Sequence, residues 1–204
     1  MVSVGTILYV FGGCGAQGRL ADLYAYDTTA KTWTKLPDHE EIDGRGGAGF
    51  VAVPEHEMLY VIGGFAGKEM NDVFQYNLRT QVWQTVYLHG TEDNKIRPFS
   101  VSCGGVLNGD LIVFFGGEVD PSAKGHEGAG GFSNDCQFFS GKTGKFLGSN
   151  SDAPKPLQRG WTSAAVLADA NRMVVFGGLS GDDESPVRLN DLWVLQVRMS
   201  DVTQ

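Results

Sequence analysis

The sequence predicts an all-β fold, a β-propeller of about four blades, from three observations. The chain of 204 residues contains 29 glycines, which separate short runs of β-branched and aromatic residues. Four of these runs end in a doubled glycine, and further strand-like segments recur in step with them. A period near 50 residues with four short strands in each unit is typical of propeller blades.

The doubled glycine marks one strand of each predicted blade. Its second glycine stands at positions 13, 64, 117 and 178, which gives steps of 51, 53 and 61 residues. Glycine permits backbone conformations that residues with a Cβ avoid, so each strand is expected to end there. The four segments are LYVFGG (8–13), LYVIGG (59–64), IVFFGG (112–117) and MVVFGG (173–178).

Two further strands follow each doubled glycine. The next one alternates as a half-buried strand does, in ADLYAYD (21–27), NDVFQYN (71–77), NDCQFFS (134–140) and NDLWVLQ (190–196). An outermost strand is predicted at TWTKL (32–36), VWQTV (82–86) and KFLGS (145–149). A blade must bury its faces against neighbouring blades, so we expect Trp33, Trp83 and Trp193 to pack between blades.

An arginine-headed strand precedes the doubled glycine, in RGGAGFVAV from Arg45, RPFSVSCGG from Arg97 and RGWTSAAVL from Arg159. The predicted propeller spans residues 1–199, with blades near 1–37, 44–87, 97–149 and 159–199 and a tail at 200–204. The first and last blades are incomplete. We therefore expect part of a larger, six-bladed type of propeller, or a homo-oligomer that covers the open ends, with a closed four-bladed ring as the alternative.

Composition excludes several classes of function. The formal net charge is −8 and no basic run occurs, which argues against a nucleic-acid partner. No apolar run approaches the roughly 18 residues that span a membrane. Cys14, Cys103 and Cys136 form no CxxC pair, so we expect reduced thiols and a cytoplasmic protein.

The repeated arginines point to one mouth of the central channel. Because strands alternate in direction within a blade, Arg45, Arg97 and Arg159 are expected beside the loops that join strands two and three. Three guanidinium groups there would suit a planar anion, such as the acidic group of a small molecule or peptide. In the alternative interpretation each arginine pairs with an acid of its own or the neighbouring blade and orients a loop.

The third repeat carries a long loop, FGGEVDPSAKGHEGAGGFSND. From its second glycine to the next strand's Asp is 18 residues, against 8 to 13 in the other repeats. The carboxylates of Glu118 and Asp120 and the imidazole of His126 would suit Fe(II), Mn(II) or Zn(II) with open positions for a substrate. The alternative is a solvated loop capped by a turn at Asp120 and Pro121.

The repeats resemble kelch repeats, and several segments carry a closer resemblance. IDGRGGAGF (42–50), IRPFSV (96–101), FGGEVDPSAKGHEGAG (115–130) and QRGWTSAAV (158–166) look like the later blades of plant nitrile-specifier, epithiospecifier and thiocyanate-forming proteins. The resemblance implies a non-heme Fe(II) site that directs glucosinolate aglucones, released by myrosinase, toward nitriles, epithionitriles or thiocyanates.

The resemblance also implies roles for individual residues. The family holds its iron with a Glu, an Asp four residues on and a His eight residues on, and here Glu118 and His126 match. Ser122 stands at the Asp position, while Asp120 is the nearby acid. Arg45 and Trp161 match positions near the family's substrate pocket.

Three functions follow from the sequence. The first is a binding module whose mouth, with Arg45, Arg97, Arg159 and Trp161, takes an acidic small molecule or protein partner. The second is an Fe(II)-dependent, lyase-like specifier that uses Glu118, His126 and Asp120. The third is a non-catalytic scaffold fragment that another chain completes.

Overall fold

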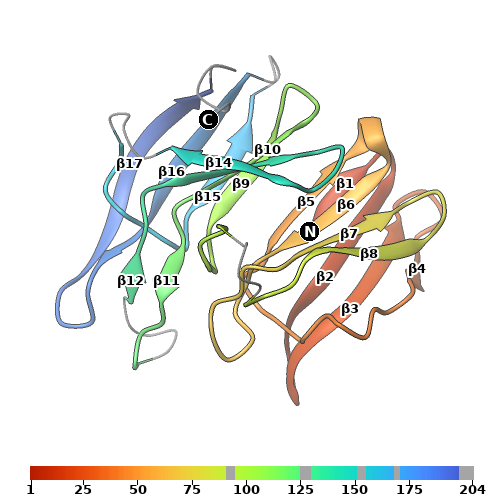
Figure 1. The fold of residues 1–204 in the computed structure, drawn as a ribbon, viewed down its shortest axis with the longest axis horizontal. Coiled ribbons are helices and arrows are strands. Elements are labelled where there is room, and N and C mark those ends of the chain that lie inside the picture. The colour runs from red at the N-terminus through yellow and green to blue at the C-terminus, as the bar shows by residue number, and fades with distance from the viewer. Residues whose placement is uncertain (91–94, 125–129, 151–154, 168–170, 198–204) are drawn as a thin grey trace.

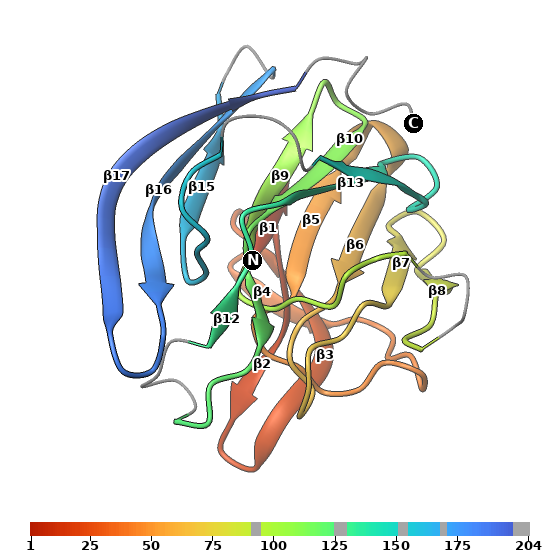
Figure 2. The ribbon, with the colours of Figure 1, turned by 60° about the vertical axis from the view of Figure 1, so that its left-hand side comes forward.

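The four repeats fold into four antiparallel sheets. We describe this architecture from a computed structural model, which covers residues 1–90, 95–124, 130–150, 155–167 and 171–197. The sheets follow one another in chain order from red to blue in Figure 1. Their innermost strands, β1, β5, β9 and β15, lie side by side in the same order (Figure 2). The prediction of an all-β, four-bladed propeller arrangement is confirmed.

The first two sheets each contain four strands in chain order. Sheet one is made of β1 (Val2–Val4), β2 (Ile7–Gly15), β3 (Gly18–Asp27) and β4 (Thr32–Lys35). Sheet two is made of β5 (Gly49–Val53), β6 (Met58–Ile62), β7 (Val73–Asn77) and β8 (Val82–Tyr87).

The third and fourth sheets continue the pattern. Sheet three is made of β9 (Cys103–Leu107), β10 (Leu111–Phe115), β13 (Cys136–Ser140) and β14 (Phe146–Asn150). Within its long loop, β11 (Glu118–Asp120) and β12 (Gly131–Phe132) form a small separate hairpin. Sheet four contains, among the described residues, β15 (Ser163–Val166), β16 (Arg172–Gly181) and β17 (Pro186–Gln196).

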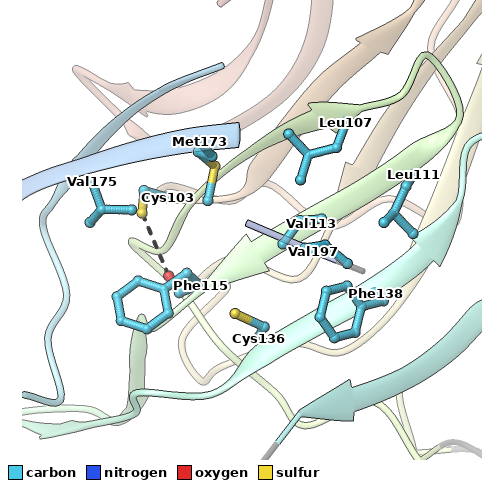
Figure 3. Packing of buried hydrophobic residues seen from close by; sticks show 10 residues of the cluster. All are labelled: Cys103, Leu107, Leu111, Val113, Phe115, Cys136, Phe138, Met173, Val175 and Val197. Carbon is cyan, nitrogen blue, oxygen red and sulfur yellow. Dashed lines mark hydrogen bonds between the residues drawn. The ribbon is translucent and has the colours of Figure 1, made fainter. Parts of the chain in front are cut away.

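The hydrophobic core lies between successive sheets. Figure 3 shows the interface of sheets three and four, where Met173 and Val175 pack on Val113, Phe115 and the neighbouring side chains. The side chains of Val113 and Met173 are fully buried. Burying apolar surface in this way is the main force that holds blades together, because no single sheet encloses a core.

Helix is almost absent from the part of the chain that the structure describes. A single 3-10 turn, η1 (Pro54–His56), joins β5 and β6. Among the described residues, no helix has the length and apolar character needed to cross a bilayer. All three cysteines are free thiols, and of these Cys14 is exposed.

The three repeat tryptophans differ in their surroundings. Trp83 packs between sheets one and two, with its ring centroid 6.2 Å from that of Phe11. Trp33 is 59% exposed and Trp193 is 40% exposed. The expectation of packing between blades therefore fails for Trp33, because it lies on the face of sheet one that no described sheet covers.

Candidate functional site

One mouth of the propeller contains a cavity lined by residues of all four repeats. Its volume is about 490 Å³. The lining comes from the segments that precede β5, β9 and β15 and from the chain at and after the doubled glycines of the first three repeats. The lining residues are Gly13, Cys14, Arg19, Gly46, Gly47, Phe65, Ser100, Val101, Glu118, Pro121, Ser122 and Trp161.

Equivalent residues of three successive repeats form a hydrogen-bonded chain along the cavity wall. The amide of Val101 donates to the carbonyl of Gly47 at 2.8 Å, and the amide of Trp161 donates to the carbonyl of Val101 at 2.9 Å. All three have left-handed backbones, with φ of 61° at Gly47, 45° at Val101 and 52° at Trp161. This conformation strains residues with side chains, above all a β-branched valine, and such strain concentrates at functional sites.

Arg19 supplies a cation to this cavity. It lies on β3 opposite Cys14, and its guanidinium carbon stands 4.4 Å from the centre of the Phe65 ring. The side chain is exposed, and no ion pair joins it to any carboxylate of the described residues. Sequence analysis missed Arg19, although it stands in the predicted loop between the doubled glycine and the strand at 21–27. That position was the available signal.

Two buried glutamates lie beside the cavity. Glu69 is 6% exposed and Glu118 is 8% exposed. The Ser100 hydroxyl donates to Oε1 of Glu69 at 3.1 Å, while the Ser100 and Glu118 backbones pair in both directions. Burial raises the pKa of Glu69, the Ser100 hydrogen bond opposes this shift, and the negative charge of Glu118 adds to it. Glu69 had no signal in the sequence beyond being an acid near a turn.

Two of the predicted ligand-binding arginines are buried in ion pairs. Arg45 pairs through both terminal nitrogens with Asp72 and also donates to the carbonyls of Asp43, at 3.0 Å, and Gly63, at 3.0 Å. Arg159 repeats this arrangement, with Asp191 at 2.6 and 3.0 Å. Both guanidinium groups are 0% exposed. The structure thus places them in the alternative arrangement, in which each arginine pairs with an acid and orients a loop.

The third arginine has a different neighbourhood. Arg97 pairs with Asp135, and Lys155 pairs with the other oxygen of the same carboxylate. Burial by itself would raise the pKa of Asp135, but the hydrogen bonds from Lys155 and Arg97 outweigh it and the pKa is lowered. Arg97 does not line the mouth cavity, whereas Trp161 does and is 46% exposed.

The predicted metal ligands are not all brought together. Glu118 lines the mouth cavity, whereas Asp120 lines a neighbouring hollow of about 510 Å³ with Asp182 and Asp183. The pairing of β11 with β12 shifts register between Glu118 and Asp120. His126 lies outside the described residues. Across the described ranges, no three His, Cys, Asp or Glu side chains are close enough to hold a metal ion.

Comparison with known proteins agrees with the four-sheet geometry. Residues 1–117 match the family model described as the KLHDC2/KLHL20/DRC7 Kelch-repeats domain. The chain belongs to the kelch-repeat family. The solved structure of YjhT superposes on 91% of this kelch chain with a TM-score of 0.66 and 16% sequence identity, which shows a shared fold.

Two curated relatives illustrate how varied this family is. The kelch chain is 29% identical over 195 residues to the N-(sulfonatooxy)prop-2-enimidothioate sulfolyase of Thlaspi arvense, a match covering 84% of this chain. It is 24% identical over 206 residues to the host cell factor of Drosophila melanogaster. The matches cover 54% of the sulfolyase, 13% of the host cell factor and 52% of YjhT, so the chain spans about half or less of each protein.

Proposed function

We propose that this kelch chain binds a small organic anion in the mouth cavity. The observation that carries the proposal is Arg19, which lines a cavity built from all four repeats and forms no ion pair with the described carboxylates. A guanidinium offers paired N–H donors that match the oxygens of a carboxylate or sulfate. Stacking on Phe65 holds its plane in place, which reduces the entropy lost on binding.

The rest of the wall suits the hydrocarbon part of such a ligand. Phe65, Val101 and Trp161 present apolar surface, and a volume of about 490 Å³ is in the ordinary range for small-molecule sites. Trp161 is 46% exposed, its backbone is held in a strained conformation, and its position in the cavity lining would let it cover a ligand.

The class of anion follows from the sulfolyase relative, whose name describes a sulfonatooxy compound. A sulfate monoester carries its charge on three oxygens at one end and an apolar chain at the other. The cavity lining offers both kinds of contact, because Arg19 is charged and Phe65, Val101 and Trp161 are apolar. We therefore take alkyl sulfates as the ligand class.

Isothermal titration with hexyl sulfate tests this proposal, with hexanol as the uncharged probe. We expect hexyl sulfate to bind with one site per chain and hexanol to bind at least tenfold more weakly, because charge-assisted hydrogen bonds contribute about 1.5–3 kcal/mol. Arg19→Gln should reduce affinity for hexyl sulfate by about 10- to 100-fold. Arg79→Gln, which alters an exposed arginine paired with Glu57, is the matched control. Equal binding of both probes would contradict the proposal.

A second candidate is an iron-dependent lyase of the specifier type, which the sulfolyase relative favours. The described residues bring one predicted ligand, Glu118, into the mouth cavity, and by themselves they do not form a three-ligand site. Iron binding thus stays a prediction for the long loop of the third repeat, which includes His126. Anaerobic titration with Fe(II) should show one tight site that both Glu118→Ala and His126→Ala abolish. Binding that survives either substitution would remove this candidate.

A further inference from the structure

We propose that this chain associates head to tail with a second copy of itself, through the two sheet faces at the ends of its row of sheets. The outer face of sheet one is called the first face here, and the outer face of sheet four is called the last face. Both are apolar, and each is the structural equivalent of a face that is buried elsewhere in the same chain.

The first face is aromatic. Between β2 and β3, the strand register places Leu8 opposite Tyr26 and Val10 opposite Tyr24. On the other side of β3, Tyr26 lies opposite Trp33 of β4. The Trp33 and Tyr26 rings stack with centroids 4.8 Å apart, yet the tryptophan remains 59% exposed. Water therefore covers a cluster of aromatic side chains that would gain free energy by burial.

The last face is aliphatic with one aromatic ring. Register places Phe176 opposite Leu192 and Val174 opposite Val194, so these four side chains share one side of sheet four. Phe176 is 54% exposed, Leu192 62% and Val194 52%. The opposite side of the same strands carries Met173 and Val175, which are buried against sheet three (Figure 3).

The repeat alignment shows what each face is built to contact. We aligned sheets one and two by their doubled glycines and by the Asp that follows each of them. In this alignment the first face is equivalent to one face of sheet two. That face consists of Leu59, Val61, Phe74, Tyr76 and Trp83. That face is buried against sheet one, where it meets Tyr9, Phe11 and Leu23.

The same alignment identifies the last face as the receiving partner. Val174, Phe176 and Leu192 of sheet four are equivalent to Tyr9, Phe11 and Leu23 of sheet one. The chain thus exposes one face of each kind, and the two kinds are those that already pack together between its sheets. A first face of one copy should therefore pack on the last face of another, as sheet two packs on sheet one.

Such a contact is heterologous, because it joins two different faces. The rotation that relates one copy to the next therefore decides whether the assembly is a closed ring or an open filament. If the rotation closes, two copies cover all four exposed faces in a ring of eight sheets, which is within the usual four to eight blades of propellers. If the rotation does not close, copies add to one another in an open filament.

Sedimentation velocity and light scattering of the 204-residue chain test this inference. We expect twice the chain mass of 22.0 kDa at about 50 µM protein, and larger species would also support the contact while showing that the ring stays open. Trp33→Asp and Phe176→Asp should each give monomers at this concentration. Lys142→Asp, in the exposed turn between β13 and β14, is the control and should leave the mass unchanged.

Mixing the two variants gives the decisive result. Copies with Trp33→Asp keep an intact last face, and copies with Phe176→Asp keep an intact first face, so an equimolar mixture should form a one-to-one dimer through a single contact. Circular dichroism and thermal melting would verify that each variant is folded. A folded wild-type monomer at 50 µM and above, or a dimer that persists in either variant alone, would overturn the inference.

Discussion

Arg45 and Arg159 occupy the same position of the repeat, because their backbone carbonyls accept from the second glycines Gly13 and Gly117. Phe99 takes this position in the third repeat, where its carbonyl accepts from Gly64, so Arg97 lies two residues before it. The carboxylate partners of Arg45 and Arg97 are buried to different degrees. Asp72 is 3% exposed and its partner Arg45 is 1% exposed. Asp135 keeps a second cation, Lys155, if Arg97 is removed. An isolated buried charge is far more costly than a half-exposed one that retains a partner.

Arg45→Met should therefore lower the free energy of unfolding by about 3–5 kcal/mol, because Asp72 would stay buried without a counter-charge. Arg97→Met should lower it by roughly 1 kcal/mol or less, because Lys155 continues to neutralise Asp135. Urea unfolding of the two variants measures the difference. The double variant Arg45→Met with Asp72→Leu should recover part of the loss, and equal effects of the two single variants would contradict this explanation.

Glu69 links stability to pH. Its pKa in the folded protein is raised above the ordinary value of 4.5. The contribution of Glu69 to the free energy of unfolding is therefore greatest below pH 4.5, and it falls as the pH rises through the raised pKa. Glu69→Gln keeps an acceptor for Ser100 but carries no charge. The variant should match the wild type near pH 4 and exceed it in stability at pH 8, as urea unfolding at both pH values would show. Glu40→Gln, at an exposed position, is the control, and a wild type that gains stability from pH 4 to 8 relative to Glu69→Gln would disprove the assignment.

At the scale of elements, the segments that enter the innermost strands combine stability with function. Gly47, Val101 and Trp161 occupy equivalent left-handed positions, but only the glycine is free of strain there. The two side chains extend the cavity wall at a cost in backbone energy. This arrangement resembles the general trade-off in which binding sites lower stability.

Trp161→Gly should stabilise the protein by about 1 kcal/mol while weakening hexyl sulfate binding several-fold, because the strain and the apolar wall disappear together. Trp161→Ala removes the same ring but retains the unfavourable φ, so it should weaken binding without any gain in stability. Thermal melting and titration calorimetry of both variants separate the two effects. A glycine variant with unchanged affinity would show that the tryptophan does not contact the ligand.

At the scale of the whole molecule, the four described sheets form a row, and the outer sides of sheets one and four carry exposed apolar side chains. Each internal interface buries apolar side chains on both sides, whereas Trp33 and Phe176 remain in water in the single chain. Association would add the same kind of contact between copies. Stability should then depend on protein concentration, because binding to the folded state shifts the unfolding equilibrium.

The melting temperature of the wild type should rise when the protein concentration is increased tenfold, while the melting temperature of Phe176→Asp should stay constant. Differential scanning calorimetry at the two concentrations makes the comparison. Lys142→Asp should follow the wild type, since its position lies in an exposed turn. A wild-type melting temperature that is independent of concentration would argue against association.

The amino-acid sequence by itself determined the strands and their order. The doubled glycines, the alternating segments and the arginine-headed strands are local patterns, and each corresponds to a strand of the structure from β2 to β17. The expectation that a strand ends at the doubled glycine holds for β6 and β10 and is wrong for β2 and β16, which continue past it through an irregularity in their pairing. Their common period was enough to predict the propeller, because blades repeat the same local chemistry. Alternation of strand direction also predicted that the entry segments and the loops between strands two and three lie at one end, and Gly46, Gly47 and Phe65 of the cavity lining come from such segments.

Only the tertiary structure decided which side chains share the mouth. The sequence showed conspicuous arginines, but it did not show that Asp72 and Asp191 bind two of them or that Arg19 reaches the cavity. Likewise, Glu118 and Asp120 line different hollows although they are two residues apart, and the strand register shifts between them. Pairing across sheets depends on contacts between residues distant in the chain, and a repeat pattern carries no information about them.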